Sequence, residues 1–142
     1  MKSTMNLDCP KFAWIILTCL GCLDLIRGFI HTFLLEYAAE FMMGLDLAVA
    51  RDDQLLLLGT FGSSNYITGC MLILIGLKAR NIAPYVFLII PVSYILGGRL
   101  ISIVATSTAR LGGVPMMTIY ILVCIGTFVA ILIWNQLNKK NG

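Results

Sequence analysis

Charged residues are scarce in this chain. Lys, Arg, Asp and Glu make up 12% of its 142 residues, whereas 59% are hydrophobic. Soluble proteins carry about 25% charged residues, because their surfaces must be hydrated. This shortage excludes an ordinary water-soluble domain and predicts an integral membrane protein with a single domain spanning residues 1–142. No basic patch with interleaved aromatic residues is present, so nucleic acid is not an expected partner.

Histidine is even scarcer, since His31 is the only one. A bis-histidine haem site is therefore excluded, and no His/Cys/Asp cluster has the spacing of metal ligands, so we predict no metal. Five cysteines form an odd set, four of them within apolar segments, which argues against a disulfide framework. Cys19 and Cys22 form a CxxC sequence, but they lack the strand-turn context of a redox motif and fit small packing residues better.

Long apolar segments are what the chain has in abundance. Four of them lie at about residues 12–35, 55–77, 82–105 and 115–134. Each is long enough to cross a hydrocarbon core of about 30 Å at about 1.5 Å per residue. The predicted fold class is all-α, a polytopic membrane four-helix bundle with short connections.

The connection from about 36 to 54 holds five acids and one base. Between these charges, Tyr37, Phe41, Met42, Leu45 and Val49 recur at helical spacing. This pattern predicts a short amphipathic helix along the membrane surface. A solvated loop with some apolar contacts is the alternative.

Three ionisable residues share one face of the first segment. At about 100° per residue, Asp24, Arg27 and His31 fall within an arc of roughly 60°. A central Asp or Arg costs about 2.5–3.5 kcal/mol on insertion scales, so this face must turn toward protein or a wet cavity. A structural Asp24–Arg27 ion pair explains two of the residues without any function, whereas a binding site explains all three.

The second segment carries a stripe of small residues. Gly62, Asn65, Gly69 and Gly76 lie within about 60° of one another around the helix axis. The glycines predict close packing against a neighbouring helix. Asn65 lies near mid-depth, so its amide needs a polar partner there.

The third segment adds Tyr94, Arg99 and Ser102. Arg99 has no acid on its own helix, so its counter-charge must come from another helix, the acidic connection or a ligand. Together with Arg27 it predicts an outward polar pocket with surplus positive charge, floored by Asp24 and Asn65. Such a pocket suits an anionic or carbonyl-bearing amphiphile, for example a lipid headgroup or a quinone.

Basic residues favour one orientation. The N-terminus, the second connection and the C-terminal tail each carry two, namely Lys2 and Lys11, Lys78 and Arg80, and Lys139 and Lys140. The two other connections carry one each, Arg51 and Arg110. The positive-inside rule therefore places both termini in the cytoplasm.

The sequence Gly97-Gly98-Arg99-Leu100-Ile101-Ser102, followed by Gly113-Val114-Pro115, resembles the DoxX-like group of small four-helix membrane proteins. Asn65 with Gly69, and the Gly76-Leu77 end of the second segment, fit the same pattern over about residues 55–134. The resemblance implies a four-helix bundle, and some members look like membrane partners of quinone-linked oxidoreductases. The acidic first connection departs from the group.

Three functions fit these patterns. The first is a non-catalytic binding or accessory subunit whose pocket holds a lipid, a quinone-like ligand or a partner helix. The second is a membrane redox or proton-coupled enzyme with His31 as acid and base and with Asp24 and Arg27 setting its charge. The third is an assembly subunit that docks other membrane subunits through its uncharged fourth segment. The candidate ligand-binding residues are Asp24, Arg27, His31, Asn65, Tyr94, Arg99 and Ser102.

Overall fold

The fold is built entirely of helices in the part of the chain that the computed structural model describes, residues 7–48, 50–104 and 114–141. The elements in chain order are α1 (Lys11–Phe33), α2 (Leu35–Tyr37), the π-helix η1 (Ala38–Met42), α3 (Arg51–Lys78), the 3-10 helix η2 (Arg80–Ile82), α4 (Ala83–Val104) and α5 (Val114–Asn141). Four helices are long and apolar enough to span a membrane. The predicted all-α class with four spans is therefore confirmed.

Two of the four long helices extend beyond their predicted apolar segments. Helix α3 begins at Arg51 rather than near 55, and α5 continues to Asn141 rather than ending near 134. Backbone hydrogen bonding does not stop where hydropathy falls, and polar side chains are compatible with a helix that leaves the membrane. Most of the predicted connection between the third and fourth spans, with Arg110, lies outside the described residues.

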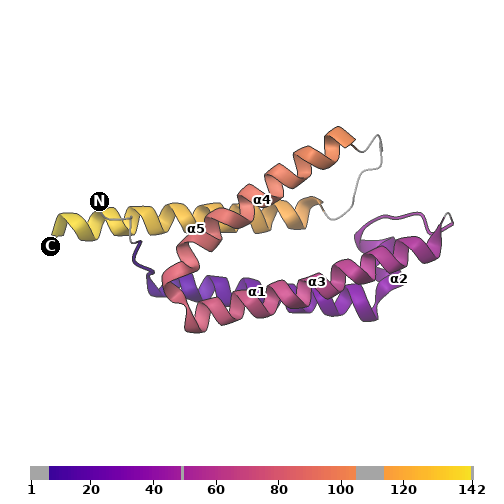
Figure 1. Ribbon diagram of the computed structural model, residues 1–142, viewed down its shortest axis with the longest axis horizontal. Helices are drawn as coiled ribbons and strands as arrows, with labels where there is room; N and C mark the ends of the chain where they lie inside the picture. Colours follow the sequence, from indigo (N-terminus) through magenta and orange to yellow (C-terminus); the bar gives the residue numbers. More distant parts are fainter. Residues whose placement is uncertain (1–6, 49, 105–113, 142) are drawn as a thin grey trace.

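Helices α1 and α3 lie side by side with their backbones in contact (Figure 1). A methyl group added to Gly21 would lie 2.7 Å from the Gly69 carbonyl oxygen, and one added to Gly69 would lie 2.8 Å from the Gly21 oxygen. One added to Gly62 would lie 2.8 Å from the His31 carbonyl oxygen. Only residues without a side chain permit this approach, so the small-residue stripe of α3 is matched by glycines on α1.

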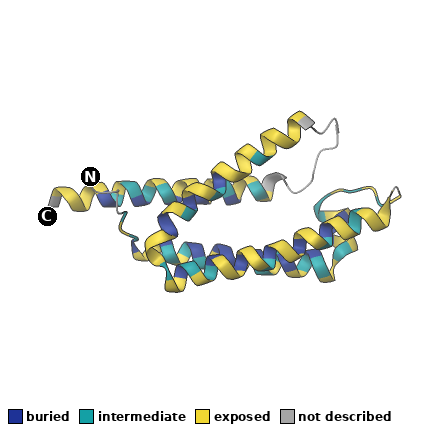
Figure 2. Cartoon of the chain, viewed as in Figure 1, coloured by how far each residue is buried: buried dark blue, intermediate teal, exposed yellow. Residues whose placement is uncertain are grey.

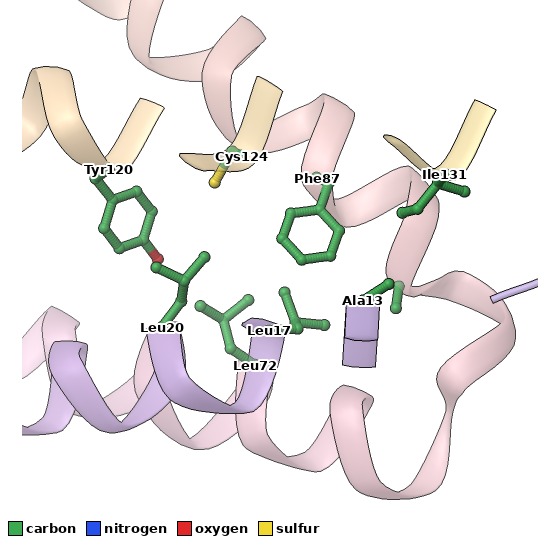
Figure 3. Close-up of a cluster of buried hydrophobic side chains, with 9 residues drawn as sticks. Ala13, Leu17, Leu20, Leu72, Phe87, Tyr120, Cys124 and Ile131 are labelled. Atoms are coloured by element: carbon green, nitrogen blue, oxygen red, sulfur yellow. The ribbon is translucent and has the colours of Figure 1, made fainter. Parts of the chain in front are cut away.

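Helices α4 and α5 form a second layer, which a buried apolar cluster joins to the first. Leu17 of α1, Phe87 of α4 and Ile131 of α5 are fully enclosed in this cluster (Figure 3). Away from the cluster, α4 is largely exposed (Figure 2). The two layers separate along α4 toward the end that carries α2 and η1 (Figure 1).

Two contacts join helices and connecting segments at the other end of the molecule. The Asn135 amide accepts from the Asp8 N–H at 3.0 Å and donates to the Asp8 carbonyl at 3.0 Å. The Arg80 guanidinium stacks on the Trp14 ring, 4.2 Å from its centroid. The segment before α1 is thereby joined to α5, and η2 is joined to the start of α1.

We expect Gly69→Ala to lower the free energy of unfolding by about 1–3 kcal/mol, because the new methyl group must displace the α1 backbone. The matched control is Gly126→Ala in α5, where an added methyl group meets no atom within 4 Å. Unfolding by sodium dodecyl sulfate in mixed micelles measures both. Equal stability of the two variants would contradict the contact between α1 and α3.

Candidate functional site

A cavity of about 830 Å³ opens where the two helix layers separate. Its walls come from α1, α3, α4, α5 and the segment that follows η1. Most of the lining is apolar, and the polar lining residues are Arg27, His31, Gln54, Ser93 and Tyr94. An apolar cavity of this size with a few convergent polar groups is typical of small-molecule sites.

Arg27 is paired at the inner side of this cavity. Its Nη1 lies 3.4 Å from Asp24 Oδ1, and the two side chains are only 11% and 8% exposed. The Tyr120 hydroxyl donates to the other carboxylate oxygen, Asp24 Oδ2, at 3.1 Å. Each oxygen of the buried carboxylate therefore has a partner, and Asp24 balances the charge of Arg27 within the bundle.

His31 lies beside Arg27 in the cavity wall and is 3% exposed. Asn65 of α3 places its Nδ2 3.4 Å from His31 Nδ1, which gives this buried amide a polar partner. The Phe61 ring lies 5.7 Å from the imidazole, centroid to centroid, and the Arg27 guanidinium lies 6.0 Å from the Phe61 centroid. The histidine is thus held by α3 and packed against an aromatic side chain.

Of the three site residues predicted on α4, one lines the cavity and two do not. Tyr94 lines the cavity, and its hydroxyl interacts with Arg27 across the layers. Arg99 and Ser102 are exposed and are not part of the lining, and the Ser102 hydroxyl donates to the Arg99 carbonyl oxygen at 2.7 Å. No carboxylate among the described residues lies within ion-pair distance of Arg99.

The predicted set is therefore partly assembled. Arg27, His31 and Tyr94 line the cavity. Asp24 and Asn65 are not in the lining, but Asp24 contacts Arg27 and Asn65 contacts His31. Arg27 lines the cavity, whereas Arg99 is exposed and is not among the lining residues, so the structure does not bring the two cations together in this cavity.

Sequence reasoning missed two contributors, Tyr120 and Gln54. Tyr120 is a buried side chain in the uncharged fourth segment, about two turns after the start of α5, and no charge or motif beside it marked it as a site residue. Gln54 was assigned to the connection, whereas α3 already includes it and turns it to the cavity.

The acidic connection closes one wall of the cavity. Glu36 and Arg51 form an ion pair between α2 and the start of α3. The Gln54 amide donates to the Asp46 carbonyl oxygen at 3.1 Å. These contacts hold Met43 and Leu45 in the lining.

Across residues 7–48, 50–104 and 114–141, no group of three His, Cys, Asp or Glu side chains is placed to hold a metal ion. The cysteines Cys9, Cys19, Cys22, Cys70 and Cys124 are free.

Comparisons with models of known protein families, with curated proteins and with solved structures found no match to this chain. The resemblance to the DoxX-like group therefore stays a prediction. The site has to be interpreted from its own geometry.

A double-mutant cycle tests the buried ion pair. We expect Asp24→Asn and Arg27→Gln each to cost about 3–5 kcal/mol of unfolding free energy, because each leaves a buried charge without its partner. The double variant should cost clearly less than the sum of the two. Detergent unfolding measures all three proteins.

The control pair is Glu36 and Arg51, whose side chains are 63% and 49% exposed. Removing either charge there should change stability by at most about 1 kcal/mol. Additive effects at Asp24 and Arg27 would contradict the pairing.

Proposed function

We propose that this protein is a non-catalytic membrane binding protein whose cavity holds a carbonyl-bearing amphiphile. The observation that carries the proposal is the cavity of about 830 Å³, apolar over most of its wall and polar at Arg27, His31 and Tyr94. An amphiphile needs both parts, since its tail requires an apolar surface and its headgroup requires hydrogen bonds.

The charge balance of the cavity favours an uncharged headgroup. Arg27 offers hydrogen-bond donors, but its charge is already met by Asp24. Arg99, which would have supplied a surplus positive charge, is not in the lining. A carbonyl oxygen can accept from Arg27 without adding a buried charge, whereas a carboxylate or phosphate would add one.

Two kinds of membrane amphiphile carry such a carbonyl group. One is a quinone with a long tail, and the other is an acyl ester lipid. They share the acceptor oxygen and the apolar chain, so the binding experiment must include both.

We also propose that both termini are cytoplasmic and that the cavity opens in the outer half of the bilayer. Supporting this, the end of the molecule that carries the termini and η2 also carries the bases Lys11, Lys78, Arg80, Lys139 and Lys140. The cavity end carries the acidic connection. This charge asymmetry follows the positive-inside rule.

An accessory role beside another membrane protein belongs to the same proposal. One face of α4 is apolar and exposed, and its Ile95, Leu96 and Leu100 are each more than half exposed. Lipid or a neighbouring subunit would cover this face, and a bound amphiphile near it would be within reach of that neighbour.

Filling the cavity should abolish binding. Gly97 lines the cavity, and a methyl group added there meets no atom within 4 Å, so Gly97→Phe should fold and occupy the ligand space. We expect affinity for decyl-benzoquinone and for methyl dodecanoate to fall about tenfold or more. Titration calorimetry in detergent measures it, with Gly126→Phe on α5 as the control. Unchanged affinity of Gly97→Phe for both probes would refute binding in this cavity.

The two arginines should differ in their effect. We expect Arg27→Gln to weaken binding of the preferred probe about tenfold or more, since a charge-assisted hydrogen bond contributes about 1.5–3 kcal/mol. Arg99→Gln should leave affinity within about twofold, because its exposed side chain is not in the lining.

Sodium dodecanoate, an anionic probe, should bind less tightly than the methyl ester to the wild type. A stronger effect of Arg99→Gln than of Arg27→Gln, or preference for the anion, would contradict the proposed headgroup site. Thermal melting in the same detergent identifies variants that fail to fold.

A further inference from the structure

We infer that Asn65 is a positioning residue that fixes the tautomer of His31, so that the neutral imidazole carries its proton on Nε2 and donates it into the cavity. The consequence of this tautomer for ligand choice rests on the binding function proposed above. The assignment of the tautomer does not depend on that function, because it can be measured without any ligand.

The contact between the Asn65 amide and the His31 ring is the observation from which the tautomer is inferred. Asn65 presents its amide nitrogen, Nδ2, at 3.4 Å from His31 Nδ1. With the amide nitrogen turned toward the ring, as this contact places it, Asn65 is the donor, and the bond we infer requires an unprotonated Nδ1 as its acceptor. In a neutral imidazole the single proton then resides on Nε2.

The surroundings of His31 favour the neutral form. Arg27 lies four residues earlier on the same face of α1, and an imidazolium there would place two cations side by side. Asp24, the nearest acid on α1, already has Arg27 and Tyr120 as partners. From α3 the ring meets the Asn65 amide and the uncharged Phe61, and Tyr94 is the ionisable lining residue of α4.

The contact between the two helices places Asn65 at the correct depth. Gly62 packs against the His31 backbone, and Asn65 lies one turn further along α3. Side chains on a helix lean toward its N-terminus, so the His31 ring lies deeper than its own backbone and meets Asn65. Gly62 and Asn65 thus work as a pair, one allowing the approach and the other orienting the ring.

This arrangement makes the polar part of the cavity rich in donors. His31 would offer Nε2–H, and Arg27 offers guanidinium N–H groups. A ligand oxygen that only accepts, as in a ketone, a quinone or an ester, fits both groups. Asn65 therefore determines headgroup specificity without touching the ligand.

The chain allows a direct test, because His31 is its only histidine. Histidine labelled with ¹⁵N gives imidazole signals from this one ring in detergent micelles. In the ligand-free wild type we expect an unprotonated Nδ1 and a protonated Nε2. A protonated Nδ1 in the wild type would overturn the inference.

Two variants separate positioning from packing. Asn65→Asp replaces the donor by an acceptor, so Nδ1 should become protonated. Asn65→Leu removes the hydrogen bond at similar volume, so the single tautomer should give way to a mixture. If both variants fold and keep the wild-type pattern, Asn65 does not set the tautomer and the inference fails.

A binding measurement links the tautomer to specificity. In the wild type, 2-tetradecanone should bind more tightly than tetradecane, which has the same chain length without the carbonyl group. In His31→Phe, which removes the donor without adding a charge, this advantage should fall about fivefold, the value of one ordinary hydrogen bond. An unchanged advantage would overturn the role of His31 Nε2 as the donor.

The two proposals fail separately. An unprotonated Nδ1 and a protonated Nε2, together with no binding of decyl-benzoquinone or methyl dodecanoate, would refute the proposed function and still support the positioning of His31. Binding of the ketone with the opposite ¹⁵N pattern would refute the positioning and leave the proposed function in place.

Discussion

Direct contact between the backbones of α1 and α3 is the constraint on which the site depends. Gly21 and Gly69 meet through each other's carbonyl groups, and Gly62 packs on the His31 backbone. In a bilayer, apolar side chains gain little by leaving lipid, so close van der Waals packing has to hold the helices together. The same approach brings Asn65 within reach of the His31 ring. Packing and site formation therefore share one interface.

Buried charge is the second constraint, and it limits what the cavity can bind. Asp24 is enclosed between α1 and α5, where an unpaired carboxylate would be strongly unfavourable. Arg27 and Tyr120 each contact one of its two oxygens, and the carboxylate in turn balances the charge of Arg27. In the binding function that we propose, a ligand would meet hydrogen-bond donors with little net charge, and a neutral acceptor would suit them best.

The cavity exists because the two helix layers are joined unevenly. The apolar cluster around Leu17, Phe87 and Ile131 joins the two layers (Figure 3). Toward the other end, α4 leaves the first layer, and the segment after η1 closes the side. The acidic connection is thus part of the cavity wall, held by the Glu36–Arg51 ion pair.

Hydropathy and helical periodicity determined the four spans, the α1 face that carries Asp24, Arg27 and His31, and the α3 stripe of Gly62, Asn65, Gly69 and Gly76. These are properties of single helices, in which fixed geometry converts spacing into direction. Only the tertiary structure decided that Tyr94 lines the cavity while Arg99 does not. It also decided that the Tyr120 hydroxyl donates a hydrogen bond to the second carboxylate oxygen of Asp24. The position of a residue relative to another helix depends on how the helices cross and separate, which side-chain packing sets and periodicity within one helix does not contain.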